Sequence, residues 1–311
     1  MTIVLGAGVG YSPLLYRKRD EWGAVAEFLR KDAIQPKSAG IEDDKVLDDY
    51  NRRIAEGFSA VERVLAKGGL DALILITADR GSQFDSSQVP QIHLQVGGEI
   101  WGDPAIQALG ESPRQLRFGC DGPIAAILIE ELVRDGFDIA EAKGAFKPIG
   151  DSKQGITPAA VEAAARLAGG LPIIPISINC HVAPVMNGKR LHLFGLALSR
   201  AAGSTEKRLG ILVSGGLSGD PRGRMAGWVD DIFDRWALAR IERGRSADLA
   251  RVWDVACRTL LGGSAAEMRL WTAAAAALEH SNCRARVRDY MPIHHAAAGV
   301  AFVTWENSAC L

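Results

Sequence analysis

Five short apolar segments limit the folds open to this chain more than any other feature of its sequence. They are rich in Val, Ile or Leu, and each ends at a glycine or a polar turn. Segments of this kind are typical of strands that are covered on both faces, as in layered α/β proteins. The predicted strands are Thr2–Leu5, Ala72–Thr77, Ile173–Ile178, Gly210–Ser214 and Gly299–Thr304.

Helical periodicity fills the intervals between these segments. In Asp44–Ala66 the apolar residues recur with a period close to 3.6, and Gly68 and Gly69 then end the pattern. The other predicted helices are Ile124–Arg134, Pro158–Ala168, Trp271–Leu278 and two within Gly227–Leu261, divided near Gly244. No internal repeat or linker interrupts the alternation. We therefore predict a single α/β domain over residues 1–311, with three layers, α/β/α, around a central mixed sheet.

Two polar stretches rich in Gly and Pro, Ile34–Asp44 and Asp85–Glu111, interrupt this pattern. We expect both to be excursions from the core, and such loops commonly shape the mouth of an active site.

Composition excludes several classes of function. The chain has 36 Lys and Arg against 37 Asp and Glu, so no basic surplus exists for binding nucleic acid. No apolar run approaches the ~18–20 residues that span a bilayer, and the N-terminus lacks the positive region of a signal peptide. The five cysteines are scattered and odd in number, which is typical of reduced thiols. We expect a cytoplasmic protein without a membrane or nucleic-acid partner.

Polar clusters follow four of the predicted strands. In open α/β sheets, ligands bind at the carboxyl ends of the strands. Together the clusters supply Tyr, Asp, Arg, His and Ser side chains, which suits a pocket for a small polar or aromatic acid. The clusters are Gly10–Pro13, Ala78–Phe84, Asn179–His181 and Ser214–Pro221.

Five stretches in a fixed order also resemble one known family. The stretch Ser214–Trp228 resembles the Gly-Gly-Leu-Ser-His signature of the LigB superfamily, the class III extradiol ring-cleavage dioxygenases such as the protocatechuate 4,5-dioxygenase catalytic subunit. The other four are Gly8–Leu15, Asp71–Phe84, Gly262–Trp271 and Asp289–His295. The resemblance covers nearly the whole chain.

The resemblance implies a non-haem Fe(II) held by two histidines and one glutamate, with a further histidine as acid/base. Here Tyr11 and Arg80 stand at the histidine ligand positions, Glu267 matches the glutamate, and Gly219 stands at the acid/base position. Arginine has no lone pair to donate and carries a permanent positive charge, so it repels a metal cation. We therefore expect no metal ligands and no cofactor, with Fe(II) only if dioxygenase activity persists.

The candidate catalytic residues are Tyr11, Arg80, His181 and Glu267. The Tyr11 hydroxyl can hydrogen-bond a phenolic ligand, or its ring can simply pack. Arg80 can bind a substrate carboxylate, or it can neutralise Glu267 through an ion pair, which is the interpretation we favour. His181 can transfer a proton or serve as a hydrogen-bonded structural residue.

The candidate substrate-binding residues share positions at or near the predicted strand ends. The histidine pair among them has the same two alternatives as His181, with the structural role favoured. These residues are Ser12, Asp79, Ser218, His294 and His295.

Three functions remain open. The first is a non-catalytic, α-type subunit or partner in an assembly that degrades aromatic compounds, forming homo- or hetero-oligomers with a paralogous subunit. The second is a metal-free lyase, hydrolase or isomerase acting on an aromatic or ring-opened acid. The third is an active Fe(II)-dependent dioxygenase with unusual ligands. All three imply a small aromatic acid or catechol-like ligand.

Overall fold

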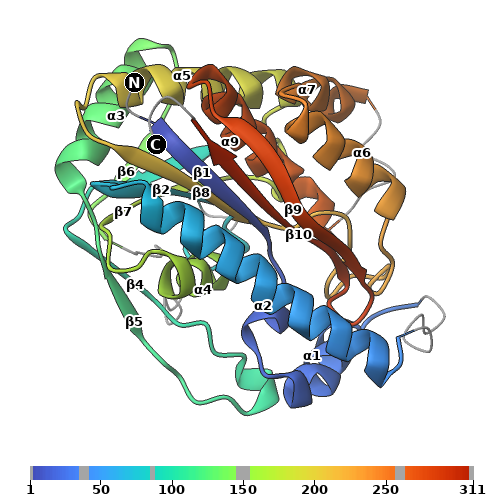
Figure 1. Cartoon of the computed structure of the whole chain (residues 1–311). Helices are drawn as coiled ribbons and strands as arrows, with labels where there is room; N and C mark the ends of the chain where they lie inside the picture. Colours follow the sequence, from blue (N-terminus) through green and yellow to red (C-terminus); the bar gives the residue numbers. More distant parts are fainter. Residues whose placement is uncertain (1–2, 35–41, 85–87, 145–154, 256–262, 308–311) are drawn as a thin grey trace.

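A mixed sheet of eight strands runs through the centre of the described part of the chain (Figure 1). The computed structural model describes residues 3–34, 42–84, 88–144, 155–255 and 263–307. In spatial order the strands are β6 (Ala140–Ala142), β3 (Ile92–Gln95), β7 (Ile173–Ile178), β2 (Ala72–Thr77), β8 (Leu209–Gly215), β1 (Ile3–Gly10), β10 (Ala298–Glu306) and β9 (Arg284–Ile293).

The four central strands, β7, β2, β8 and β1, are parallel, so their carboxyl ends meet at one edge of the sheet. Strands β10 and β9 continue the sheet in antiparallel fashion beside β1. On the far side, β3 is antiparallel to β7 and parallel to β6. A separate antiparallel pair is formed by β4 (Glu99–Gly102) and β5 (Leu116–Gly119).

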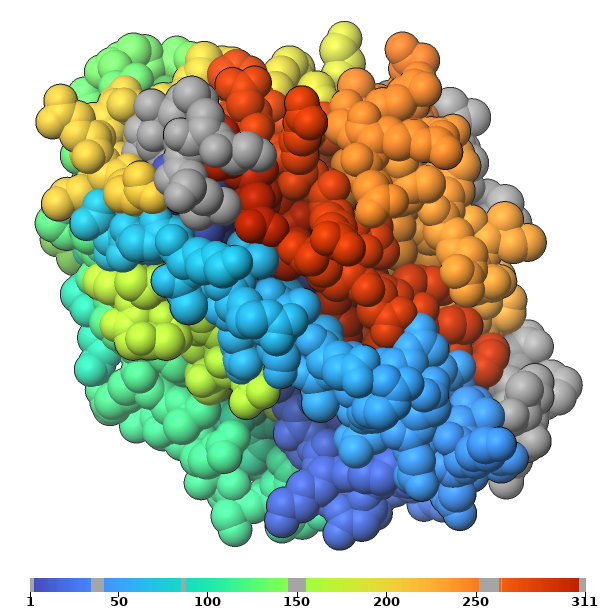
Figure 2. Space-filling view, in the orientation of Figure 1, coloured from blue at the N-terminus to red at the C-terminus, as the bar shows by residue number. Residues whose placement is uncertain are grey.

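Helices cover both faces of the sheet, which confirms the predicted α/β/α layers. One face carries α1 (Trp22–Leu29), α2 (Asp44–Lys67) and α4 (Pro158–Leu167), and Figure 2 shows α2 running diagonally across the near surface. The other face carries α3 (Gly122–Arg134), α5 (Gly188–Gly203), α6 (Asp231–Glu242), α7 (Ser246–Val255) and α9 (Met268–His280). Short 3-10 turns are η1 (Pro13–Tyr16), η2 (Arg19–Glu21), η4 (Gln107–Leu109) and η5 (Gly263–Glu267).

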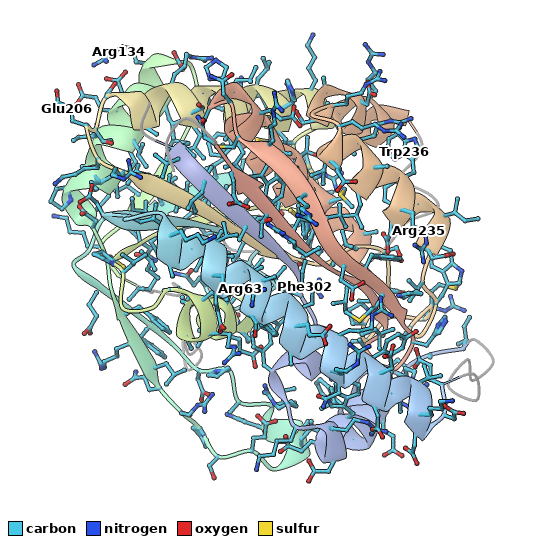
Figure 3. All side chains as sticks on the ribbon, viewed as in Figure 1. Arg63, Arg134, Glu206, Arg235, Trp236 and Phe302 are labelled. Atoms are coloured by element: carbon cyan, nitrogen blue, oxygen red, sulfur yellow. The ribbon has the colours of Figure 1, made fainter. Side chains whose placement is uncertain are left out.

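Close packing fixes each helical layer against the sheet. In α2, Gly57 lies directly over the ring of Phe302 from β10, where an added Cβ would come within 2.3 Å of a ring carbon. Phe58 and Phe302 meet edge to face with centroids 5.1 Å apart, and Figure 3 shows Phe302 beneath α2. On the opposite face, every residue of α9 from Met268 to Leu278 is buried. No helix in the described ranges is long and apolar enough to cross a membrane.

The first strand is longer than predicted. It spans Ile3–Gly10 instead of ending at Leu5, and all eight residues are buried. The glycines of this segment, which indicated a turn in the sequence, lie inside the strand. Because they have no side chain, α9 can pack closely against the strand at these positions. A Cβ at Gly6 would lie 2.6 Å from Leu278, and one at Gly8 would lie 2.5 Å from the ring of Trp271. Glycine inside a strand marks such a close approach.

The stretch Asp85–Glu111 also differs from the prediction. We expected an excursion from the core, yet β3 belongs to the central sheet and β4 forms a ladder with β5. Each strand has only four residues, and Gly97 and Gly98 separate them, so the alternation is too short to recognise in the sequence. The other polar stretch, Ile34–Asp44, lies mostly outside the described residues.

Candidate ligand-binding site at the strand ends

The carboxyl ends of the four parallel strands bring together residues that are far apart in the sequence. Tyr11 follows β1, Arg80 follows β2 and His181 follows β7, while Gly216 follows β8. The backbone N–H of Tyr11 donates to the carbonyl of Gly215 at 3.1 Å, which ties the first of these turns to the last. The predicted pooling of strand-end residues is therefore present in the fold.

Glu267 lies at the centre of this group, at the end of η5 and only 2% exposed. Its Oε1 accepts a hydrogen bond from Nε of Arg80 at 2.6 Å and lies 2.9 Å from Nε2 of His181. Its Oε2 accepts from the backbone N–H of Gly216 at 2.6 Å. The ion pair expected between Arg80 and Glu267 is present.

These contacts favour the ionised form of Glu267. Burial acts to raise the pKa of this carboxyl group, but the positive charge of Arg80 and the contact with His181 outweigh burial and lower the pKa to about 2. An ionised carboxylate only accepts hydrogen bonds, so Nε2 of His181 must be a donor in this contact. Glu267 is therefore a neutralised anion and not a free base.

Arg80 faces two adjacent cavities of about 500 Å³ and 450 Å³. One third of its side chain remains exposed. Only Nε is used by Glu267, and within the described residues neither terminal nitrogen of Arg80 has a hydrogen-bond partner. A planar guanidinium whose two terminal nitrogens are free is suited to binding a carboxylate. Arg80 therefore neutralises Glu267, as expected, whereas the binding of a substrate carboxylate by Arg80 stays a prediction.

A second polar cluster begins at Tyr11, which lines the smaller cavity. Its hydroxyl donates to Oε2 of Glu162 in α4 at 2.9 Å, and Oε1 of Glu162 pairs with Arg17. Arg17 also pairs with Glu111, Nε to Oε1, at 2.7 Å, and donates to the carbonyl of Pro104 at 3.0 Å. This cluster joins the cavity wall to the loop that carries Pro104.

Burial controls the protonation of this cluster. It raises the pKa of Glu162 to about 7, although Arg17 opposes that shift. Burial and the neighbouring Glu162 also raise the pKa of Tyr11 well above its usual value, so Tyr11 stays a neutral phenol. The sequence prediction missed both Glu162 and Arg17. The available signal was a single acidic residue within the Ala-rich helix that begins at Pro158.

Gly219 lies in a backbone position that excludes larger residues. Its φ is +143°, and an added Cβ would lie 2.2 Å from the carbonyl oxygen of Ala297. The residue forms an isolated bridge to Ala298 at the start of β10. A histidine therefore cannot be placed here without moving the neighbouring backbone.

Two of the predicted substrate-binding residues use their side chains for hydrogen bonds within the protein. Both carboxylate oxygens of Asp79, which lies in the wall of the larger cavity, accept backbone N–H groups, from Gly81, Gln83 and Phe84. Ser218 is fully buried, and its hydroxyl donates to Asp234 at 2.7 Å.

The remaining three predicted residues lie near the C-terminal hairpin. Ser12 lines the smaller cavity and donates to the carbonyl of Ala296 at 3.1 Å. Nδ1 of His294 lies 2.8 Å from the carbonyl oxygen of Gly227. His295 forms an ion-pair contact with Glu42, which also accepts both histidine backbone N–H groups. Neither histidine is among the residues that line the two cavities.

Among the residues that the structure describes, no group of three or more His, Cys, Asp or Glu side chains is arranged to hold a metal ion.

Known proteins resemble this chain over most of its length. The family model described as the catalytic LigB subunit of aromatic ring-opening dioxygenase matches residues 36–301. The 2,3-dihydroxyphenylpropionate/2,3-dihydroxicinnamic acid 1,2-dioxygenase of Klebsiella pneumoniae subsp. pneumoniae is 25% identical over 302 residues, covering 82% of this chain and 90% of the relative. The Escherichia coli protein of the same name is 26% identical over 309 residues, with the same coverage.

A solved structure shares the fold. The crystal structure of an uncharacterised protein from Escherichia coli K12 superimposes with a TM-score of 0.55, covering 97% of this chain and 99% of that one. The two sequences are 10% identical, so this likeness concerns the fold alone.

Proposed function

The chain belongs to the family of catalytic LigB subunits of aromatic ring-opening dioxygenases, and we propose that it is a non-catalytic member that binds an aromatic acid without iron. In this proposal the chain acts in an assembly that degrades aromatic compounds and pairs there with a paralogous subunit.

The observation that carries this proposal is that protein donors already contact both carboxylate oxygens of Glu267. Among the positions that match the family's iron ligands, Glu267 alone carries a carboxylate, and its two oxygens are taken by Arg80, His181 and the N–H of Gly216. A cation bound to Oε1 would lie beside the guanidinium of Arg80, and the two positive charges would repel each other. The donor set at this position does not fit Fe(II).

The other family positions support the same proposal. Tyr11 directs its hydroxyl to Glu162 and not to Glu267. At the acid/base position, Gly219 has no side chain to carry a proton, and Ala297 leaves no room for one. The three replacements together remove two metal ligands and the proton carrier.

The cavities support ligand binding in the absence of metal. The smaller one, about 450 Å³, has a size suited to one aromatic ring with a short substituent. Its walls combine the apolar Phe28 and Ile106 with Tyr11 and the guanidinium of Arg80. The named substrate of the bacterial relatives is a dihydroxyphenyl ring with a propionate, which has the same combination of ring and carboxylate.

Iron loading tests the loss of the metal centre. We expect purified protein to retain no stoichiometric iron after anaerobic incubation with Fe(II), and the double variant with Tyr11→His and Arg80→His to bind iron measurably. The control with Tyr11→Gln and Arg80→Gln removes the same charge without adding imidazoles and should stay iron-free. One iron per chain in the wild-type protein, with ring cleavage of 3,4-dihydroxybenzoate, would overturn the proposal.

Ligand binding and pairing are tested separately. Isothermal titration calorimetry with 3,4-dihydroxybenzoate and 3-(2,3-dihydroxyphenyl)propionate should detect binding to the isolated chain. Arg80→Met should abolish it, whereas Arg134→Met, at an exposed ion pair on α3, should not. Co-expression with a histidine-complete paralogue should yield a complex, and two separate peaks in size-exclusion chromatography would refute the pairing.

One observation favours a second candidate, a metal-free enzyme in the same pocket. Tyr11 and Glu162 form a hydroxyl–carboxylate pair whose carboxyl group has its pKa raised to about 7 by burial, a value suited to proton transfer near neutral pH. Turnover of an aromatic or ring-opened acid by metal-free protein, abolished in Glu162→Gln, would favour this candidate over the non-catalytic one.

A further inference from the structure

We propose that Glu162 makes the Tyr11 hydroxyl a hydrogen-bond acceptor toward the smaller cavity, so that the site selects ligands that carry a hydrogen-bond donor as well as a carboxylate. The inference rests on the proposed function, because it assumes that this cavity binds an aromatic acid. It goes further by naming the chemical group that the ligand must present and the residue that imposes the requirement.

The Tyr11 hydroxyl has a single proton to donate. That proton is donated to Oε2 of Glu162, whose side chain is 4% exposed and is not among the residues that line the cavity. A tyrosine hydroxyl has one O–H donor and two acceptor lone pairs. With the proton committed to Glu162, only lone pairs remain for a ligand in the cavity.

Arg17 fixes the orientation of Glu162. It pairs with Oε1 of the carboxylate, so Oε2 faces Tyr11. Arg17 is itself held by two contacts to Glu111, from Nε to Oε1 at 2.7 Å and from NH2 to Oε2 at 3.0 Å. Its side chain is 10% exposed, so this arrangement is shielded from water. The carboxylate therefore cannot rotate to release the Tyr11 proton without breaking a buried ion pair.

The opposite requirement applies at Arg80, which lines the same cavity. Its terminal nitrogens have no hydrogen-bond partner in the described residues and can only donate. The cavity thus presents donors at Arg80 and an acceptor at Tyr11. A ligand complements both when it carries a carboxylate for Arg80 and an un-ionised hydroxyl or an amino group for Tyr11.

A ligand that lacks the donor leaves the Tyr11 lone pairs unpaired in a partly buried site. Leaving a buried polar group without its partner typically reduces affinity by about tenfold or more. The site should therefore discriminate between ligands of nearly equal size that differ only in this group. Hydroxybenzoates and fluorobenzoates form such a pair, because fluorine is similar in size to a hydroxyl group and has no proton to donate.

The test compares the 3- and 4-hydroxybenzoates with the matching fluorobenzoates by isothermal titration calorimetry. The experiment is run near pH 8, about one unit above the value to which burial raises the pKa of Glu162, so that the carboxylate is ionised. We expect at least one hydroxybenzoate to bind about tenfold more tightly than its fluoro counterpart in the wild-type protein.

Two variants identify the source of the preference. Tyr11→Phe removes the acceptor and should reduce the hydroxyl preference to about onefold while benzoates still bind through Arg80. In Glu162→Gln, the amide oxygen should face Arg17 and the amide NH2 should donate to Tyr11. The Tyr11 proton then turns toward the cavity, and the preference should shift toward acceptor groups, measured with 4-acetylbenzoate against 4-hydroxybenzoate.

The outcomes separate this inference from the function on which it rests. Equal affinities for hydroxy- and fluorobenzoates in the wild-type protein would overturn the inference and leave the proposed ligand class intact. A hydroxyl preference that persists in Tyr11→Phe would also overturn it. The absence of binding by every benzoate and dihydroxyphenyl acid would refute the proposed function itself, and the inference with it. Tyr11→Phe keeps the test decisive even if Glu162→Gln does not fold.

Discussion

Arg80 and Glu267 form an ion pair of 2.6 Å, between Nε and Oε1, at the position where the family resemblance implies an iron site. The two residues are 187 positions apart in the sequence. Arg80 follows β2, whereas Glu267 ends η5 and accepts from the N–H of Gly216, which follows the neighbouring parallel strand β8. The fixed positive charge of Arg80 thus neutralises the buried carboxylate of Glu267.

The ion pair should contribute to stability. Arg80→Met leaves Glu267 buried without its main counter-charge, and we expect the free energy of unfolding to fall by about 3 kcal/mol. Urea denaturation monitored by circular dichroism measures this loss. The control Arg134→Met removes an exposed arginine that pairs within α3, and such pairs contribute less than about 1 kcal/mol. Equal losses in the two variants would show that Glu267 does not depend on Arg80.

Close packing between β1 and α9 should make Gly8 sensitive to a single methyl group. Gly8→Ala places a Cβ 2.5 Å from the ring of Trp271, so we expect destabilisation of about 1–3 kcal/mol. The matched control is Gly23→Ala in α1, where an added Cβ meets no atom within 4 Å. That change should be neutral or slightly stabilising, because alanine favours helix over glycine. A stable Gly8→Ala protein would mean that α9 can move away from the strand.

The position of Gly219 should resist restoration of the family histidine. Gly219→His combines a left-handed φ with a contact of 2.2 Å between Cβ and the Ala297 oxygen, so we expect a loss of at least about 2 kcal/mol. Thermal denaturation compares it with Gly98→His, where an added Cβ meets nothing within 4 Å. If Gly219→His has the same melting temperature as the wild-type protein, the turn after β8 can accommodate an acid/base side chain, and the prediction is wrong.

Asp234 should make stability depend on pH. Its Oδ2 accepts from the hydroxyls of Ser218 at 2.7 Å and Tyr290 at 2.9 Å, and burial raises its pKa from the usual 3.8 to about 6. The folded protein therefore holds this proton more tightly than the unfolded chain. The resulting stabilisation is complete below about pH 4 and is lost as the pH rises through about 6.

The variant Asp234→Asn cannot titrate at this position. The difference in unfolding free energy between wild-type protein and variant should therefore decrease by as much as about 3 kcal/mol between about pH 4 and pH 7. Urea titrations at several pH values measure it. A difference that stays constant over this range would contradict the raised pKa.

The sequence predicted the layers of the fold well because buried strands and amphipathic helices carry local signals. The strands Ala72–Thr77 and Ile173–Ile178 have the predicted bounds. The exceptions are places where tertiary contacts override the local signal. In β1, glycines that indicate a turn in the sequence instead allow α9 to pack closely against the strand. In β3, a segment of only four residues forms a strand because it pairs with β7.

For the candidate site, strand-end positions in the sequence predicted that Tyr11, Arg80 and His181 lie together, and the family resemblance added Glu267 to the candidates. They could not identify Glu162, because its role depends on α4 lying against the turn after β1. Nor could they show that Asp79 accepts hydrogen bonds from the backbone and that Ser218 donates to a buried carboxylate. Which hydrogen bonds a side chain forms depends on the three-dimensional geometry, which residue type alone does not specify.

The sequence by itself determined the family and the layered fold, because these depend on residue type and order along the chain. The replacement of iron-binding histidines by Tyr11 and Arg80 is a prediction from the family resemblance. Only the tertiary structure decided that Arg80 neutralises Glu267 while keeping two donors free, and that Tyr11 turns its proton toward Glu162. Both arrangements are set by distances of about 3 Å between side chains from separate strands and helices, and only packing fixes such distances.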